Sequence, residues 1–209
     1  MGDGVDVTAT LDRLGPDDVR PLARLHRRAF PGFFLSTLGE AFLVEFYRAF
    51  LTDPTAVTVV ARTSDGGVHG AVVGTTQPAG FFGRLVRRRW LGFAAAAARS
   101  TVTRPRIVPR LVKALRYRGD APTGADGALL SSICVQPSRR GSGLGRQLER
   151  AWLREVAARG VAAAYLTTDR DGNDPVNEFY RSGGWLLIDR YTTREGRAMN
   201  RYVKKWDTL

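Results

Sequence analysis

The stretch SRRGSGLGRQLERAW, residues 138–152, is the part of the sequence that decides the fold. Its three glycines alternate with other residues, and a run with the spacing of an amphipathic helix follows them directly. Glycine has no Cβ, so successive backbone N–H groups can converge on a phosphate group. The helix that follows adds the positive end of its dipole at the same place. This glycine loop, residues 138–145, is therefore predicted to bind phosphate between a strand and a helix.

Two common phosphate-binding motifs do not fit the glycine loop. A P-loop needs a lysine directly after its last glycine, and none follows here. The dinucleotide fingerprint G-x-G-x-x-G is also broken, because Arg146 stands in the position of the third glycine. In addition, the strands before the loop have the pattern of an antiparallel hairpin, which that fold does not use. The phosphate therefore belongs to another kind of ligand.

Residues 135–145 read VQPSRRGSGLG, and this stretch resembles the acetyl-CoA motif of the GNAT N-acetyltransferases, V-x-P-x-x-[RQ]-G-x-G-[IL]-G, position by position. The resemblance implies that acetyl-CoA is the acyl donor and that its pyrophosphate contacts the loop. The arginines would neutralise the remaining phosphate charge. The cofactor-binding residues that the resemblance implies here are Arg140, Gly141, Ser142, Gly143, Leu144, Gly145 and Arg146.

The stretch NDPVNEFYRSGGW, residues 173–185, is similar to a second family motif, N-x-x-A-x-x-[FL]-Y-x-x-x-G-[FW], with Val176 in place of the alanine. The resemblance implies that Asn173 contacts or shapes the groove of the pantetheine arm, a role that Asn177 could share. It also implies that Tyr180 lies near the thioester sulfur and protonates the leaving thiolate. From the residues alone, Asn173 fits a helix N-cap equally well, and Tyr180 fits a core aromatic.

The family also pairs the pantetheine arm with the strand before the loop, which implies main-chain contacts from Ile133, Cys134 and Val135. The expected reaction is direct attack of a deprotonated amine on the thioester, with a strand N–H near Val135 stabilising the oxyanion. We expect the Cys134 thiol itself to be inert packing. The sequence does not identify a general base, and Asp169 is the acid that we assign to the substrate side.

The hydrophobic patterns predict an α/β chain. Together with the resemblance they predict a GNAT fold: a mixed central sheet with one parallel βαβ crossover, flanked by helices. Residues 1–209 would form a single domain, with a basic helical insertion at 77–126 between the third and fourth strands. The predicted elements are helices at 15–30 and 35–51, strands at 55–62, 67–76 and 127–135, a helix at 145–159, a strand at 161–168, a helix at 174–184 and a closing hairpin at 185–193 and 198–206.

The composition sets limits on the class of protein. The chain of 209 residues is 44% hydrophobic, enough for one sizeable core. A single cysteine excludes an internal disulfide, and with two histidines we expect no metal site. No apolar run approaches the roughly 20 residues of a membrane span. The polar start, MGDGVDVTAT, does not have the pattern of a secretory signal, so we expect a cytoplasmic protein.

The positive charge is concentrated in one segment. The net charge is +12, and eleven of the 32 basic residues lie between positions 80 and 118, a segment with no acidic residue. The rest of the chain has 21 basic and 20 acidic residues, because 32 minus 11 is 21. Like charges this close repel one another, so the pattern suggests a local anionic partner.

Three interpretations of the basic segment stay open. Its helices could cover the acceptor site and bind an anionic substrate such as a nucleotide-linked amino sugar, with Arg88 and Arg89 as substrate residues. They could instead form a peripheral membrane surface or a solvated charged face. The runs AFPGFFLSTLGEAFL and PAGFFGRLVRRRW look similar to a GNAT branch of surface-polysaccharide enzymes, which favours the first. Nucleic acid is not expected, because no recognised binding fold accompanies the charge.

The leading hypothesis is an acetyl-CoA-dependent N-acetyltransferase that acts on a primary amine, with an amino sugar or a nucleotide-linked amino sugar as the candidate acceptor. One alternative is an acyltransferase for a protein or peptide terminus or for an antibiotic amine. Another is a non-catalytic module that binds acyl-CoA or a membrane surface.

Overall fold

The structure is a computed structural model that describes residues 9–31, 33–64, 66–101, 126–193 and 196–206. At its centre lies a seven-stranded mixed sheet in the order β1-β2-β3-β4-β5-β7-β6. Neighbouring strands are antiparallel except β4 and β5, which confirms the predicted single parallel pair. The strands are β1 (Thr10–Asp12), β2 (Ala56–Arg62), β3 (Val68–Thr75), β4 (Ala128–Val135), β5 (Ala163–Asp169), β6 (Leu186–Thr192) and β7 (Ala198–Lys205).

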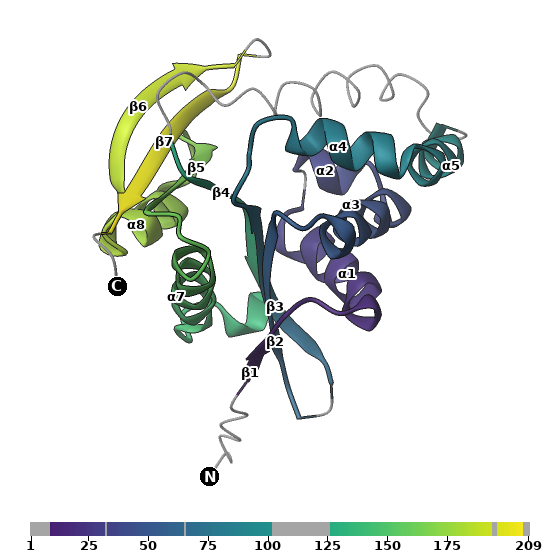
Figure 1. The fold of residues 1–209 in the computed structure, drawn as a ribbon, viewed down its shortest axis with the longest axis horizontal. Coiled ribbons are helices and arrows are strands. Elements are labelled where there is room, and N and C mark those ends of the chain that lie inside the picture. The colour runs from purple at the N-terminus through teal and green to yellow at the C-terminus, as the bar shows by residue number, and fades with distance from the viewer. Residues whose placement is uncertain (1–8, 32, 65, 102–125, 194–195, 207–209) are drawn as a thin grey trace.

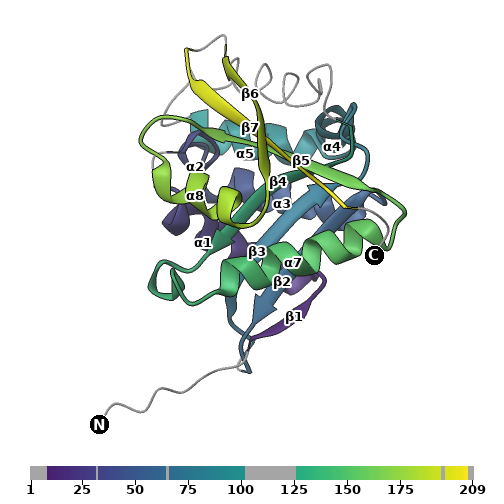
Figure 2. The ribbon, with the colours of Figure 1, turned by 90° about the vertical axis from the view of Figure 1, so that its left-hand side faces the viewer.

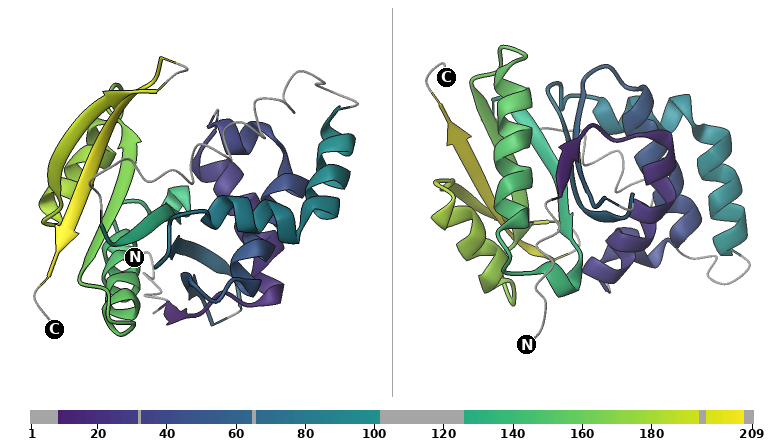
Figure 3. Two further views of the ribbon diagram at one scale, coloured as in Figure 1. Left: turned by 45° about the horizontal axis from the view of Figure 1, so that its top comes forward. Right: turned by 90° about the horizontal axis from the view of Figure 1, so that it is seen from below.

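Helices cover both faces of the sheet (Figures 1 and 3). One face carries α1 (Val19–Ala29), α2 (Phe34–Thr37), α3 (Glu40–Thr52), α4 (Phe81–Arg88) and α5 (Trp90–Thr101). The other face carries α7 (Leu144–Ala157) and α8 (Asp174–Ser182). Short 3-10 turns precede α1 at Pro16–Asp18 and α7 at Pro137–Arg139.

The predicted elements are present, with three differences. Gly39 divides the predicted helix at 35–51 into α2 and α3. The predicted helical insertion is divided in its described part: α4 ends at Arg88, because Arg89 leaves the helical conformation before α5 begins. The short β1 was not predicted, since three residues carry no period and its pairing with β2 defines it. The part of the predicted insertion at 102–125 lies outside the described residues.

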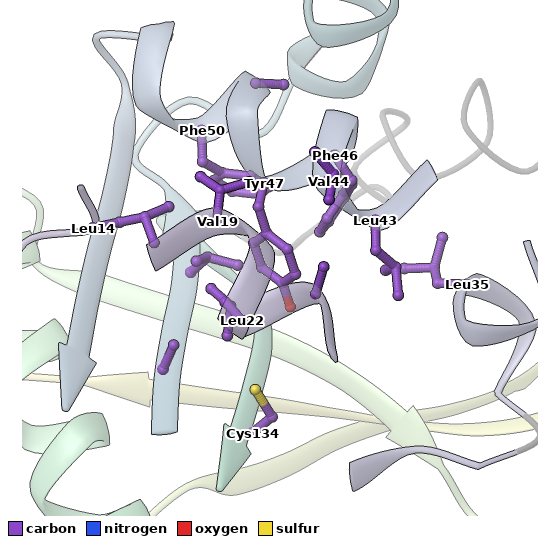
Figure 4. Packing of buried hydrophobic residues seen from close by; sticks show 14 of the residues in the cluster. Leu14, Val19, Leu22, Leu35, Leu43, Val44, Phe46, Tyr47, Phe50 and Cys134 are labelled. Atoms are coloured by element: carbon purple, nitrogen blue, oxygen red, sulfur yellow. The ribbon is translucent and has the colours of Figure 1, made fainter. Parts of the chain in front are cut away.

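Two apolar cores follow from this layering. In α7, Leu144, Leu148, Trp152 and Val156 recur every four residues and are all buried against the sheet. The Trp152 Nε1–H donates to the carbonyl of Val57 at 3.0 Å, which fastens α7 across β2 (Figure 2). The opposite core is formed by aromatic and aliphatic residues of α1 and α3 on the other face (Figure 4). Within the described part of the chain, no helix has the length and apolar character that crossing a membrane requires.

Candidate active site

The parallel strands β4 and β5 separate after a short contact. They pair only at Ala128 with Ala164 and at Leu129 with Tyr165. Beyond these pairs β4 stays with β3, and β5 stays with β7. A bulge at Ser131 adds to the divergence, because its neighbours pair with consecutive residues of β3. The facing edges of the two strands therefore carry main-chain groups with no strand partner in the described part of the chain.

The register shows which residues of β4 face this open edge. The Gln136 N–H donates to the His69 carbonyl at 2.8 Å, so Gln136 points towards β3. Because alternate residues of a strand point to opposite edges, Cys134 also faces β3, whereas Ile133 and Val135 face the open edge. Of the three residues predicted to make main-chain contacts, Ile133 and Val135 have main-chain groups at the open edge. The main chain of Cys134 pairs with β3 instead.

The open edge of β5 is closed by asparagine side chains. By the same alternation, the carbonyl of Asp169 points away from β7 and has no strand partner. It accepts hydrogen bonds from Asn173 Nδ2 at 3.2 Å and from Asn177 Nδ2 at 3.0 Å. Asn173 also donates to Thr168 Oγ1 at 2.7 Å and makes no side-chain cap to α8. The two predicted asparagines are thus brought together, as structural partners of the β5 end.

Asn177 is the centre of a buried polar cluster that the sequence did not reveal. Its side-chain oxygen accepts from Asn200 Nδ2 at 2.8 Å and from the Tyr202 hydroxyl at 3.0 Å. Its amide nitrogen is already used by the Asp169 carbonyl and by the carbonyl of Asn173 at 3.0 Å. With 3% of its surface exposed, Asn177 orients α8 against β5 and β7. These contacts occupy both of its polar atoms.

The glycine loop has the backbone that the sequence predicts. Gly141 and Gly143 adopt φ values of +81° and +83°, which L-residues with a Cβ rarely adopt. No atom of the described residues lies within 4 Å of a Cβ placed at either position, so the loop is open towards that part of the chain on its outer side. The N–H groups of Gly141, Gly143 and Gly145 donate no hydrogen bond to the described residues. Ser142 supports the loop through its hydroxyl, which donates to the Arg139 carbonyl at 2.8 Å.

These three free donors lie at the N-terminus of a 14-residue helix, where the helix dipole also favours an anion. Leu144 anchors this end by burial, and Gly145 approaches the Phe179 ring, where an added Cβ would lie 3.5 Å away. The residues present therefore fit the pyrophosphate of a coenzyme A molecule through backbone N–H groups.

The two predicted arginines of the loop are directed elsewhere. Arg140 Nη2 donates to the Ala29 carbonyl at the end of α1, at 2.9 Å. Arg146 packs over the Phe179 ring at 4.2 Å and donates to the Phe179 carbonyl at 2.5 Å. It also pairs with Glu149, which is fully buried and accepts from Trp185 Nε1. Arg146 thus joins α7 to α8, and Glu149 joins α7 to Trp185, directly before β6.

Tyr180 lies in the core beside this network. Its ring is 5% exposed, with centroids 5.8 Å from Trp185 and 5.9 Å from Tyr202. Burial, with the nearby Glu149 charge, raises the pKa of Tyr180 well above its ordinary value. The hydroxyl therefore keeps its proton at neutral pH, as a proton donor must.

The opposite face of β4 carries a second polar cluster, which the sequence did not reveal. Tyr47 reaches from α3 towards β4, where Cys134 lies (Figure 4). The Tyr47 hydroxyl lies 2.6 Å from His26 Nδ1 of α1. Burial raises the pKa of Cys134 to about 12, so the thiol is protonated, as expected for inert packing. Burial also raises the pKa of Tyr47.

The predicted substrate residues of the basic segment have acidic partners. Arg89 Nη2 lies 2.8 Å from Glu45 Oε2, and Arg88 Nη1 lies 3.5 Å from Asp53 Oδ2. Arg84 also reaches Asp53, at 3.4 Å. Both acids are buried and belong to α3 or directly follow it. The sequence suggested that these cations need an anionic partner. The structure instead pairs them with acidic residues from outside the basic segment.

Asp169, the third predicted substrate residue, is also paired. Both of its carboxylate oxygens lie 2.7 Å from Arg197 Nη2, in the turn between β6 and β7. The Arg197 guanidinium also lies 5.2 Å from the centre of the Phe33 ring, in the connection between α1 and α2. This contact joins the end of β5 to the α1–α2 connection.

Comparisons with known proteins agree with this geometry. A family model described as the acetyltransferase (GNAT) family matches residues 20–185. No curated protein matches the chain. Three solved structures share the fold at identities too low to show more than the fold. They are SsHAT (22% identity, TM-score 0.71, 95% of this chain and 98% of that chain), a putative acetyltransferase of the GNAT family from Desulfovibrio desulfuricans (17%, 0.62, 94% and 98%), and the PaiA N-acetyltransferase from Thermoplasma acidophilum in complex with coenzyme A (13%, 0.58, 95% and 99%).

Proposed function

The chain belongs to the acetyltransferase (GNAT) family, which takes its acyl group from acetyl-CoA, and from this premise we propose that it acetylates a small primary amine. The observation that carries the proposal is the combination of two sets of unpaired main-chain groups. One is the set of N–H groups in the glycine loop that have no partner among the described residues, and the other is the open edge of β4 at Ile133 and Val135. The loop supports the pyrophosphate, and the strand edge supports the pantetheine arm.

The chain's own groups supply the remaining steps of a direct transfer. The amine attacks the thioester carbonyl, a C–N bond forms and the C–S bond breaks. We assign the stabilisation of the developing oxyanion to the Val135 N–H, which faces the open edge. We assign the proton for the leaving thiolate to the Tyr180 hydroxyl, which burial keeps protonated. The proton lost by the amine leaves through water.

We propose an amino sugar, free or nucleotide-linked, as the acceptor class. The support is the similarity of two sequence runs, around residues 29–43 and 78–90, to a branch of surface-polysaccharide enzymes. Both runs lie on the face of the sheet opposite α7 and α8, where α2, α3 and α4 are found.

A thiol-release assay with acetyl-CoA tests the proposed function. Each amine of a panel is mixed with protein and acetyl-CoA, and free CoA is measured against a control without amine. The panel contains amino sugars, nucleotide-linked amino sugars, polyamines, aminoglycosides and peptides. We expect amine-dependent release with at least one amino sugar. Tight CoA binding by calorimetry without release for any amine would instead identify a non-catalytic acyl-CoA-binding module.

A further inference from the structure

Helices α1 and α2, with Pro31 between them, line a pocket of about 570 Å³ to which none of the predicted site residues contributes. Its volume falls in the range of small-molecule sites. Helix α1 contributes three cations to it, and α2 contributes two hydroxyl groups. The lining residues are Arg24, Arg27, Arg28, Pro31, Ser36 and Thr37.

The charge in this pocket is not balanced. Arg24 Nε lies 3.0 Å from Glu40 Oε1, and the same carboxylate lies 3.8 Å from Arg27 Nη1. Arg28 forms no ion pair with any acidic residue in the described part of the chain. Among the described residues, the three guanidinium groups thus have one carboxylate partner, which contacts Arg24 and Arg27 but not Arg28. Their spacing places them on one face of α1, where they repel one another without an anion.

A polar atom of the pocket also lacks a partner. Ser36 Oγ is buried and forms no hydrogen bond to the described residues. Buried hydroxyls normally form hydrogen bonds, so an unpaired one in a residue that lines the same pocket as three arginines indicates a missing acceptor. Guanidinium and hydroxyl donors together match a phosphate group, which presents several oxygens to paired N–H donors.

The α1–α2 connection lies close to the ends of both separated strands. On the β4 side, Arg140 of the glycine loop donates to the Ala29 carbonyl at 2.9 Å. On the β5 side, Phe33 contacts Arg197, which holds Asp169. A ligand that occupies the pocket is therefore near the edges at which we place the acyl transfer.

We propose that this pocket, formed by Arg24, Arg27, Arg28 and Ser36, binds a phosphate group of the acceptor amine. The proposal rests on the proposed acetyl transfer and names the acceptor more closely. It places the phosphate at arginines of α1. The earlier candidates, Arg88 and Arg89, are paired with Asp53 and Glu45. The same chemistry could come from the 3′-phosphate of coenzyme A, so the test separates the two sources.

The first measurement is calorimetric binding of inorganic phosphate to the full chain saturated with CoA, so that the glycine loop is occupied. We compare wild type, Arg28→Gln and the double variant Arg27→Gln/Arg28→Gln. The control is Arg150→Gln/Arg154→Gln, which removes the same charge from exposed positions of α7. We expect at least a tenfold weaker affinity in the α1 double variant, an intermediate loss in Arg28→Gln and wild-type affinity in the control.

Equal phosphate affinity in wild type and the α1 variant, or no binding by wild type, would overturn the proposal. This readout needs no acceptor turnover, so it remains informative if the amine panel gives no product. CoA affinity, measured in parallel, reports separately on the proposed function.

The second measurement separates the two sources of phosphate. CoA and dephospho-CoA affinities are compared in wild type and in the α1 double variant, and both should be unchanged. Glucosamine and glucosamine 6-phosphate then serve as acceptors, and we expect the double variant to lose about tenfold in kcat/KM for the phosphorylated amine alone. A loss of CoA affinity that dephospho-CoA does not share would assign the pocket to the coenzyme and overturn the acceptor assignment.

Discussion

The glycine loop and helix α4 both present positive charge, but they hold it in different ways. In the loop the charge comes from backbone N–H groups at a helix N-terminus, and three of them have no partner among the described residues. In α4 it comes from arginine side chains, and three of the four arginines at residues 84–89 are paired with buried acids of another element. Unpaired donors are available to a ligand, whereas paired cations hold the helix in place.

This difference shows why charge counting misleads. Each acid that neutralises α4 lies more than 30 positions earlier in the chain than its partner. Glu45 lies beneath α5 as well, because a Cβ on Gly92 would come within 2.4 Å of its carboxylate. A segment without acids can therefore have neutralised cations. The predictions below test the contrast, beginning with the largest expected effect.

Gly143→Glu should weaken CoA binding by at least about 100-fold, because a like charge facing phosphate costs several kcal/mol. Calorimetry with CoA measures it. Gly160→Glu is the matched control, because Gly160 has φ +75°, has open space around it and lies beyond the far end of α7. The control carries the same strain and charge and should bind CoA normally. Equal loss in both variants would show that strain, and not phosphate contact, is responsible.

Tyr180→Phe should lower kcat by about 100-fold with little change in the acetyl-CoA KM, because it removes only the proton donor. The raised pKa means that the donor form persists above the ordinary value of 10.0, so loss of this proton should not limit kcat at neutral pH. Single-turnover kinetics measures the chemical step. A rate within about twofold of wild type would leave Tyr180 as a core aromatic only.

Glu45→Gln should lower the free energy of unfolding by about 2 kcal/mol, because it leaves Arg89 without its charged partner. The effect is below that of a fully buried pair, since the Arg89 side chain is 29% exposed. Arg87→Gln, at an exposed position of α4, should change the free energy of unfolding by less than about 0.5 kcal/mol. Denaturant unfolding measures both. A larger loss in Arg87→Gln than in Glu45→Gln would contradict the structural role of the pair.

Asp53→Asn should cost about 1 kcal/mol at neutral pH, and the difference from wild type should shrink in acid. Burial alone would raise the pKa of Asp53, but hydrogen bonds from Thr55 and the charge of Arg84 hold it below its ordinary value of 3.8. Because the folded-state pKa is lowered, the contribution is present above 3.8 and disappears as the pH falls through the folded value. Denaturant unfolding of both proteins at about pH 6 and about pH 3 measures this pH dependence. The same difference in stability at both pH values would show that the Asp53 charge does not stabilise the fold.

The fold was largely predictable because the sequence patterns that indicate it each span only a few residues. Residues four apart in α7 already define its buried face, and the Val-rich hairpin of β2 and β3 has its turn in the sequence between them. The glycine loop was predictable for the same reason, since the positive φ values need glycine at those positions. The short β1 could not be predicted, because three residues acquire their structure only through pairing with β2.

The site was less predictable than the fold. The motifs pointed to Asn173 and Asn177, but their hydrogen bonds to the Asp169 carbonyl depend on where β5 separates from β4. Likewise, the choice of Ile133 and Val135 over Cys134 depends on the register with β3. Register is a relation between two strands, and a motif within one strand does not contain it.

The sequence by itself determined the local features: the helix and strand periods, the glycine loop and the resemblance to an acetyl-CoA motif. Each depends on the conformational preferences of residues within a few positions of one another. Only the tertiary structure decided which cations are neutralised and which strand edges stay open. Those outcomes arise from contacts between elements far apart in the chain, such as Arg89 with Glu45 or Arg140 with the end of α1. The electrostatic energy of a charge depends on its neighbours in space, and folding alone brings those neighbours together.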